Sequence, residues 1–235
     1  MEYKASLHLH TNNDLEDSSI IKYSIYDLID EAQRLDFKIL ALTTHKKFVF
    51  KKEFSEYAKN KGILLIPGIE AEIDGWHCLI LNCDQTAEQL KTINDLIIYK
   101  KNHPNCFIIA PHPNYKRKSI GLKLLEKYQE VFDAIEYSWF YSSKFNLNAA
   151  TAILAKKINK PMIATSDLHR LEYLNVSYAI IYSENLEITT IFQAIRENKF
   201  ENVSQPQPLW KLISFFMVML SNPLRLLKKI NLFNN

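Results

Sequence analysis

The sequence is poor in glycine and cysteine, and it contains no long uncharged run. Four glycines and eight prolines in 235 residues exclude collagen-like and low-complexity chains. Three cysteines without CxxC spacing predict free thiols in a reducing compartment, which favours a cytoplasmic location. The N-terminal stretch MEYKASLHLH lacks the apolar segment of a signal peptide. The longest uncharged stretch near the C-terminus, 212–224, falls short of the roughly 20 residues that span a bilayer.

Neither sign of charge dominates the chain. It has 29 Lys and Arg against 26 Asp and Glu, a net charge of +3, which argues against nucleic acid as an obligate partner. No acidic residue follows Glu201, whereas Lys211, Arg225, Lys228 and Lys229 do. The basic character therefore belongs to the C-terminal segment, and the rest of the chain carries a net charge of −1.

Short apolar runs alternate with helical patterns through most of the chain. The strand-like runs cover residues 3–9, 38–42, 63–69, 78–81, 106–110, 132–137, 161–165 and 178–182. The helical patterns cover residues 25–32, with Ser24 and Asp27 as a cap, and 52–60, 87–101, 122–131, 148–158 and 186–196. Such alternation predicts parallel βαβ units, and hence an α/β barrel or an open sheet. We expect one body over 1–204, then a linker at 205–208 and a separate tail to residue 235.

Six of the seven histidines lie in or directly after predicted strands. They are His8, His10, His45, His77, His112 and His169. The seventh, His103, lies in a polar turn and is expected at the surface. Because the carboxyl ends of barrel strands form one face, we expect the six imidazoles to converge.

Two short motifs place ligand-type side chains on one face of a strand. His8 and His10 are two residues apart, as are Asp167 and His169, and side chains in a strand repeat with a period of two. Glu70 closes the apolar run LLIPGIE, where a carboxylate could bridge two ions. A lone HxH pair is more often an ordinary surface pair. Six histidines that coincide with Glu70 and Asp167 favour a site for divalent ions.

Five ordered motifs resemble those of the polymerase and histidinol phosphatase (PHP) superfamily. They are SLHLHT at 6–11, TTH at 43–45, PGIE at 67–70, APHP at 110–113 and SDLH at 166–169. The resemblance covers residues 3–185 and is closest to the small, stand-alone bacterial PHP phosphoesterases. It implies a distorted (β/α)7 barrel with two or three divalent metal ions.

The resemblance also implies which residues hold the first two ions. His8, His10, Glu70 and Asp167 would hold the first. Glu70 would bridge to a second ion, and His112 and His77 would complete the second site. His77 could instead be a buried strand histidine, since its strand matches only a loose family pattern.

A third ion would be held by His45 and His169, by the same resemblance. Its remaining ligand would come from the loop after His10. Glu16 has the better spacing for that role, and Asp14 is its rival.

Two departures from the family pattern motivate an alternative function. Ser6 stands where the family usually has Asp, and Thr44 replaces the Asp of the TDH motif. Neither position is a core imidazole ligand, so metal binding should survive. The alternative is a non-catalytic metal-binding or regulatory module that keeps the PHP fold.

The expected reaction is hydrolysis of a phosphate ester. Bridged divalent ions activate water and stabilise charge on phosphoryl oxygens, which makes Glu70 and Asp167 the predicted catalytic residues. Zinc, manganese and iron all accept such ligands. Lys46, Arg117 and Arg170 follow the motifs and are the predicted substrate-binding cations. A nucleotide, a short oligonucleotide or a histidinol-phosphate-like compound would serve as the small phosphorylated substrate.

The roles of Glu136 and of the C-terminal tail leave alternatives open. Glu136 is expected either to orient a ligand or substrate or simply to end its strand. The tail is apolar nearly all round over 209–220 and basic thereafter. It could pack on the barrel, form an oligomer contact, or lie on an anionic membrane surface.

Overall fold

The computed structural model describes residues 1–115 and 118–220. Arg117 and the second half of the predicted tail, 221–235, lie outside the described residues. Every residue that the sequence predicts as a metal ligand falls within the two described ranges.

Nine strands form one continuous sheet in the order β7-β6-β5-β4-β3-β2-β1-β8-β9. They are β1 (Glu2–Leu9), β2 (Ile39–Leu42), β3 (Leu64–Ile73), β4 (Trp76–Leu81), β5 (Phe107–Ala110), β6 (Ala134–Ser138), β7 (Met162–Thr165), β8 (Ser177–Tyr182) and β9 (Phe200–Ser204). The neighbours β1, β2 and β3 are parallel, as are β5, β6 and β7. The β4 strand runs antiparallel to β3 and β5, and β8 and β9 are antiparallel additions beside β1. The reversed β4 is what distorts the barrel.

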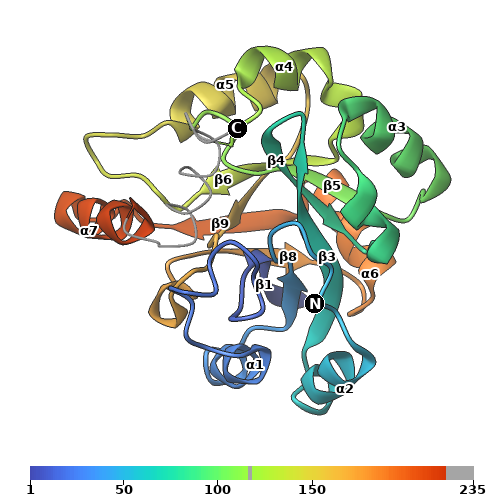
Figure 1. Ribbon diagram of the computed structural model, residues 1–235, viewed down its shortest axis with the longest axis vertical. Helices are drawn as coiled ribbons and strands as arrows, with labels where there is room; N and C mark the ends of the chain where they lie inside the picture. Colours follow the sequence, from blue (N-terminus) through green and yellow to red (C-terminus); the bar gives the residue numbers. More distant parts are fainter. Residues whose placement is uncertain (116–117, 221–235) are drawn as a thin grey trace, which may run out of the picture.

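Helices surround this sheet (Figure 1). The α-helices are α1 (Ile25–Arg34), α2 (Lys52–Asn60), α3 (Ile93–Asn102), α4 (Leu122–Lys127), α5 (Asn148–Lys157), α6 (Ile188–Arg196) and α7 (Leu209–Leu220). Three short 3₁₀ helices are η1 (Gln85–Gln89), η2 (Gln129–Val131) and η3 (Leu171–Tyr173). The predicted cap of α1 is confirmed, because Ser24 and Asp27 bond to each other's backbone N–H groups.

The sheet curls until its two ends approach each other, which makes a nearly closed barrel. A parallel bridge joins Leu9 at the end of β1 to Leu168 just after β7. At the other side of the gap between the two sheet ends, the side chain of Asn202 in β9 forms backbone hydrogen bonds with β7 like those of a neighbouring strand. Its amide nitrogen donates to the carbonyl of Met162 at 2.7 Å, and its oxygen accepts from the N–H of Ala164 at 2.7 Å. The distorted barrel predicted from the sequence is thereby confirmed.

Some details of the predicted elements were wrong. The helix expected over 122–131 is divided into α4 and η2. The helix expected over 87–101 is split into η1 and α3, because the Thr92 side chain accepts a hydrogen bond from the Asp95 N–H and starts a new helix. The β9 strand was not predicted, because its exposed, polar sequence has no apolar run. It forms by pairing with β8, a contact that the local sequence does not reveal.

One apolar cluster fixes the tail to the barrel. Leu212 and Phe215 of α7 are buried in the same cluster as Leu9 of β1, Ile29 of α1 and Trp139, which follows β6. The backbone N–H of Gln207, in the expected linker, also donates to the carbonyl of Tyr141 at 2.8 Å. The described part of the tail is thus packed on the body, while the division at residue 204 stays a prediction.

Within the described ranges, no helix combines the length and the apolar character needed to cross a membrane.

The barrel closure generates a stability prediction. Replacing Asn202 with Ala leaves the Met162 carbonyl and the Ala164 N–H without these partners, which should lower the free energy of unfolding by about 1–2 kcal/mol. Urea denaturation measures the change. Asn105→Ala is the matched control, an exposed asparagine whose side chain bonds to no described residue, and it should change stability by less than about 0.5 kcal/mol. Equal effects of both substitutions would contradict the closing role of Asn202.

Candidate metal centre

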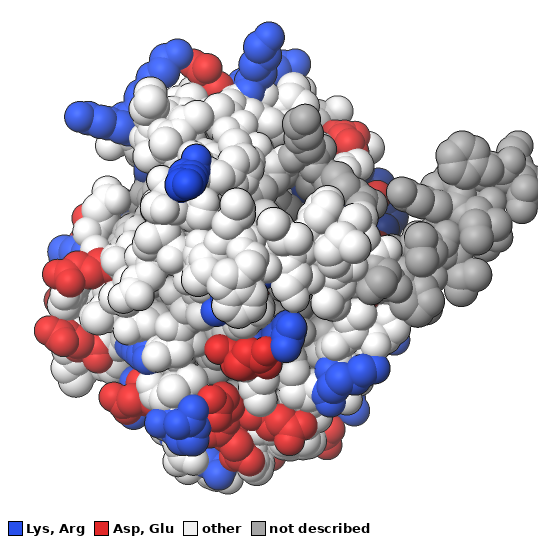
Figure 2. Space-filling view, turned by 90° about the vertical axis from the view of Figure 1, so that its left-hand side faces the viewer, with Lys and Arg blue, Asp and Glu red and all other residues white. Residues whose placement is uncertain are grey.

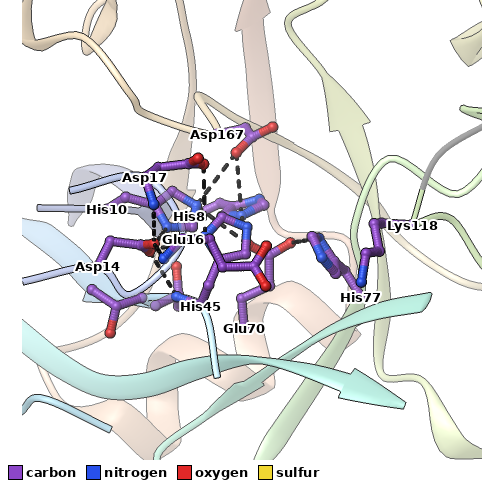
Figure 3. A network of polar contacts seen from close by, with 12 residues as sticks. His8, His10, Asp14, Glu16, Asp17, His45, Glu70, His77, Lys118 and Asp167 are labelled. Atoms are coloured by element: carbon purple, nitrogen blue, oxygen red, sulfur yellow. Dashed lines mark hydrogen bonds and ion pairs between the residues drawn. The ribbon is translucent and has the colours of Figure 1, made fainter. Parts of the chain in front are cut away.

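The six strand-associated histidines meet Glu70 and Asp167 at one end of the barrel. Figure 3 shows four of them, His8, His10, His45 and His77, around the two carboxylates. His8 lies in β1 and His10 directly after it, and His45 follows β2, where its backbone forms a bridge with Glu70 of β3. His77 lies in β4. His112 follows β5, and Asp167 and His169 follow β7. Glu70 itself does not end its strand as predicted, because β3 continues to Ile73 through its pairing with β4.

One oxygen of Glu70 faces the first expected ligand group. Its Oε2 atom lies 3.2 Å from His8 Nε2 and 3.3 Å from His10 Nε2. The Oδ1 atom of Asp167 lies 3.4 Å from each of the same two nitrogens. Four ligand atoms, from β1, β3 and the segments that follow β1 and β7, therefore point at one another, as the ligands of a single ion would.

The other oxygen of Glu70 faces the second expected group. Its Oε1 atom lies 2.7 Å from His77 Nδ1 and 3.4 Å from His112 Nε2. The structure thus brings His77 into the cluster. Because its two oxygens face different groups, Glu70 has the placement of a bridging ligand (Figure 3).

The nitrogen and oxygen atoms of the cluster are arranged to bind divalent ions rather than to form hydrogen bonds with one another. Six of them are buried without a hydrogen bond of acceptable geometry to any described residue: Nε2 of His8 and His10, both carboxylate oxygens of Glu70, and both ring nitrogens of His77. Buried polar atoms are rarely left unsatisfied, because each one costs free energy. Imidazole and carboxylate ligands around a shared point suit zinc, manganese or iron.

Asp14 orients two of the imidazoles. Its Oδ2 atom accepts hydrogen bonds from Nδ1 of His10 and Nδ1 of His45, both at 2.9 Å, and from the His45 backbone N–H. Its Oδ1 atom accepts from the backbone N–H groups of Glu16 and Asp17. With both Nδ1 atoms held in this way, Nε2 of each ring is turned toward Glu70. Such outer partners commonly fix the orientation of metal-binding histidines.

Glu136 of β6 performs the same task on the other side. Its Oε1 atom accepts from His8 Nδ1 at 2.8 Å and from the Thr165 hydroxyl. Its Oε2 atom accepts from the His112 backbone N–H at 2.5 Å. Of the two roles left open for Glu136, the structure favours orientation of ligands.

The third expected group is less compact. His45 and His169 lie near His10, and Glu16 groups with His45 and His77. Between the rivals, Glu16 lines the pocket, whereas both oxygens of Asp14 are engaged in orienting its neighbours.

The side chains at the two departures from the family pattern bond to residues outside the proposed ligand set. The Ser6 hydroxyl lies 2.9 Å from the Ser166 hydroxyl, and the Thr44 hydroxyl donates to the Lys47 carbonyl at 2.6 Å. Neither substitution removes a donor atom from the cluster.

The backbone is strained at four positions of the site, one of which is Lys118, with a φ angle of 55°. Lys46, His112 and Asp167 have φ angles of 59°, 32° and 41°, in the left-handed region that residues with a Cβ seldom adopt. Strain of this kind persists only where the surrounding structure enforces it, and it gathers at functional sites.

Burial and charge act against each other on the pKa values of the cluster. Burial alone would raise the pKa of Glu70, but at the low pH where this carboxyl titrates, the protonated rings of His77, His45 and His8 hold its pKa well below its usual value. Glu70 is therefore ionised at neutral pH. Burial would lower the pKa of His10, but Asp14 and the neighbouring carboxylates outweigh it and raise the pKa to about 10. Burial dominates at His77 and lowers its pKa to about 4, which leaves that ring neutral at neutral pH.

An open pocket of about 430 Å³ leads to this cluster. Polar side chains of the cluster form its base, together with Lys46, Glu72 and Lys118. Its opposite wall is apolar, and it consists of Trp139, Phe140 and the α7 residues Phe215, Phe216, Met219 and Leu220.

The two described basic side chains that were predicted to bind substrate lie in two different pockets. Lys46 lines the pocket, and its Nζ atom lies 2.8 Å from Glu16 and 2.5 Å from Glu72. Lys118 pairs with the same Glu72 carboxylate. Arg170 lies outside this pocket, in a neighbouring hollow, where it pairs with Glu172.

Sequence reasoning missed two acidic residues of the site. Asp17 lies 2.9 Å from His169 Nε2, and Glu72 holds both lysines. Glu72 follows Glu70 by two residues in the same strand, so strand periodicity could have placed it on the same face. No comparable signal marks Asp17, because it lies in an irregular loop.

The family model of the PHP domain matches residues 6–152, well over half of the chain. The chain belongs to the PHP domain family. A comparison with curated proteins gives no significant match.

Several solved structures share the fold of this PHP domain protein. A two-domain Bacteroides vulgatus protein that contains a predicted PHP-like metal-dependent phosphoesterase is 18% identical, with a TM-score of 0.66 over 87% of this chain and 65% of that one. The lesion-specific endonuclease PfuEndoQ from Pyrococcus furiosus is 14% identical, with a TM-score of 0.64 over 92% and 66%. PsfC from Pseudomonas syringae is 15% identical, with a TM-score of 0.61 over 94% and 98%. The chain thus spans about two thirds of the first two proteins, and at these identities the likeness concerns the fold.

The geometry predicts metal uptake coupled to proton release. The metal-free protein should bind at least two divalent ions per chain, because Glu70 faces two ligand groups. The pKa of His10 near 10 means that this ring is protonated at pH 8, so metal binding there must expel its proton. Elemental analysis gives the stoichiometry, and calorimetry in buffers of different ionisation enthalpy gives the proton count. Less than one ion per chain, or uptake without proton release, would contradict this interpretation.

Proposed function

We propose that the protein is a metal-dependent phosphoesterase that hydrolyses small phosphate esters in the cytoplasm. The observation that carries this proposal is the placement of Glu70, whose two oxygens face two separate ligand groups at the base of an open pocket. Membership of the PHP family supports it, as does a fold shared with proteins described as a metal-dependent phosphoesterase and an endonuclease. The catalytic assignment of Glu70 and Asp167 is part of the proposal.

Divalent zinc, manganese or iron ions bound by these residues would supply an activated water and positive charge against the phosphoryl oxygens. The ligand set proposed for two or three such ions is His8, His10, Glu16, His45, Glu70, His77, His112, Asp167 and His169. The role of Glu70 is to hold the two ligand groups at a fixed separation. Asp14 and Glu136 keep the imidazoles in one orientation, which removes the cost of reorganising them during the reaction.

The proposed phosphate site consists of two lysines. Lys46 and Lys118 both approach one oxygen of Glu72 at the edge of the cluster, so one carboxylate positions two cations beside the pocket. A phosphate dianion arriving there would meet both ammonium groups. Lys46 was predicted from the sequence for this role, and Lys118 replaces Arg170, which lies in the neighbouring hollow.

The alternative is a regulatory module that binds metal without turnover. Ser6 and Thr44 motivate it, although both side chains bond away from the cluster. Hydrolysis of aryl phosphates with added manganese separates the two functions, since a regulatory module would bind the ion and leave every ester intact. Nucleotides, short oligonucleotides and histidinol phosphate belong in the same panel.

Glu70→Gln tests the bridge. The neutral amide presents only one oxygen, so the variant should lose at least about 100-fold in kcat, as removal of a catalytic charge commonly does. It should also hold fewer ions per chain. The matched control is Glu56→Gln on the exposed face of α2, which should retain both activity and metal. Normal turnover by a folded Glu70→Gln variant would rule out the bridging role.

Lys118→Met tests the phosphate site. Loss of one charge-assisted contact should raise KM by about tenfold and change kcat little, because the contact is made equally in the bound and reacting states. Lys123→Met, an exposed lysine of α4, serves as the control and should leave KM unchanged. An unaltered KM for Lys118→Met would place the substrate phosphate elsewhere.

A further inference from the structure

The α7 helix has one face toward the pocket and another face toward solvent. One face of it completes the pocket, and the Phe215 ring packs on Trp139 with ring centroids 5.0 Å apart. The Phe215 ring also lies 6.1 Å from the ring of His169. The apolar wall opposite the proposed metal ligands is therefore built largely from a helix outside the ring of helices around the barrel (Figure 1).

The other face of α7 is apolar and exposed to solvent. Trp210, Ile213 and Met217 are 71%, 55% and 59% exposed, and their spacing places them along one side of the helix. Of the fourteen large apolar side chains exposed in the described residues, six belong to this helix of 12 residues. The others are scattered as single residues or a pair, which is normal for a surface. The concentration of exposed apolar side chains on α7 indicates a surface that binds a partner.

The sequence from residue 202 onward carries side-chain charge of one sign only, which suits an anionic membrane. No acidic residue occurs in the sequence after Glu201, whereas four cations do. The side from which α7 projects is largely uncharged at its centre, with charged side chains at its margins (Figure 2). An apolar helix face with a tryptophan and flanking basic residues is the composition of a helix that lies in a membrane interface. A second protein surface would not by itself require the absence of acidic residues.

We propose that α7 binds the surface of an anionic membrane through Trp210, Ile213 and Met217, and that the pocket takes phosphate esters whose alcohol group is apolar. The bound membrane would lie beside the pocket wall, because Phe216, Met219 and Leu220 of the same helix line it. The phosphate would enter toward Lys46 and Lys118, and the alcohol would rest on the aromatic wall. Membrane binding by α7 does not depend on catalysis, whereas the substrate class rests on the proposed phosphoesterase function.

Trp210 provides a direct probe of membrane binding in the full chain. The other two tryptophans, Trp76 and Trp139, are buried, so a change in exposed tryptophan fluorescence reports on Trp210. Vesicles of phosphatidylcholine mixed with phosphatidylglycerol should shift its emission to the blue and protect it from acrylamide. Phosphatidylcholine alone should act more weakly, and added salt should weaken binding to the mixed vesicles.

A triple variant tests the exposed face without touching the pocket. Trp210→Ser, Ile213→Ser and Met217→Ser together should lower co-sedimentation with the mixed vesicles by at least about tenfold, because apolar surface is lost. The same variant should hydrolyse a soluble aryl phosphate at the normal rate, since none of the three residues lines the pocket. The double variant Ile98→Ser and Ile153→Ser, on exposed faces of α3 and α5, is the matched control and should bind vesicles normally.

The substrate class is tested with esters that differ in their alcohol. The value of kcat/KM should be at least about tenfold higher for 1-naphthyl phosphate than for glycerol phosphate, because the aromatic wall buries the ring. Phe216→Ser should reduce this preference, because it removes part of the aromatic wall. Equal kcat/KM values for the two esters would overturn the substrate class.

The outcomes separate the two proposals. Vesicle binding without hydrolysis of any ester would refute the phosphoesterase and support the membrane helix. Hydrolysis without vesicle binding, or equal binding by the triple variant, would overturn the membrane helix and leave the enzyme. A protected Trp210 in the absence of vesicles, with a molecular mass that rises with concentration, would show that a second copy covers α7 and would also overturn the membrane proposal.

Discussion

The buried carboxylate of Glu70 is the constraint on which the site depends. Five imidazoles approach it within 3.4 Å, and neither oxygen has a hydrogen bond of acceptable geometry to a described residue. An ionised group in such a place is costly unless opposite charge compensates it. Protonated histidines provide that charge in the metal-free protein, and divalent ions would provide it in the loaded one. The carboxylates of Asp14 and Glu136 then become necessary, because they hold the rings that face Glu70.

The sequence predicts well how the strands of the barrel bring the histidines of this cluster together. The histidines of β1 and of the segments after β2, β5 and β7 could be placed because parallel strands bring their carboxyl ends together. The HxH and DxH spacings could be read because side chains of a strand alternate. The five ordered motifs then allowed the family to be recognised. All six expected histidines do lie in the cluster, and His103 instead stacks on Tyr99 away from it.

What the sequence could not predict depends on contacts between distant segments. Asp14 and Glu16 both lie in the loop after His10, and only the loop conformation engages one with imidazoles and turns the other into the pocket. The β9 strand has no apolar pattern, and it is defined by β8 and by the Asn202 side chain. The inward face of α7 could not be identified either, because the helix is apolar nearly all round, and packing against Trp139 selects that face.

The reversed β4 strand has a consequence for the order in which the site can assemble. Glu70 and His77 lie on adjacent arms of the β3–β4 hairpin, joined by a tight turn, so this pair can form through local contacts alone. His8 and Asp167, in contrast, are brought together only when the first strand of the barrel meets the segment after β7. Chain closure over such a separation carries a larger loss of entropy. The Glu70–His77 pair can thus exist in an incomplete barrel, while the contact between His8 and Asp167 forms only after β1 has met the segment that follows β7.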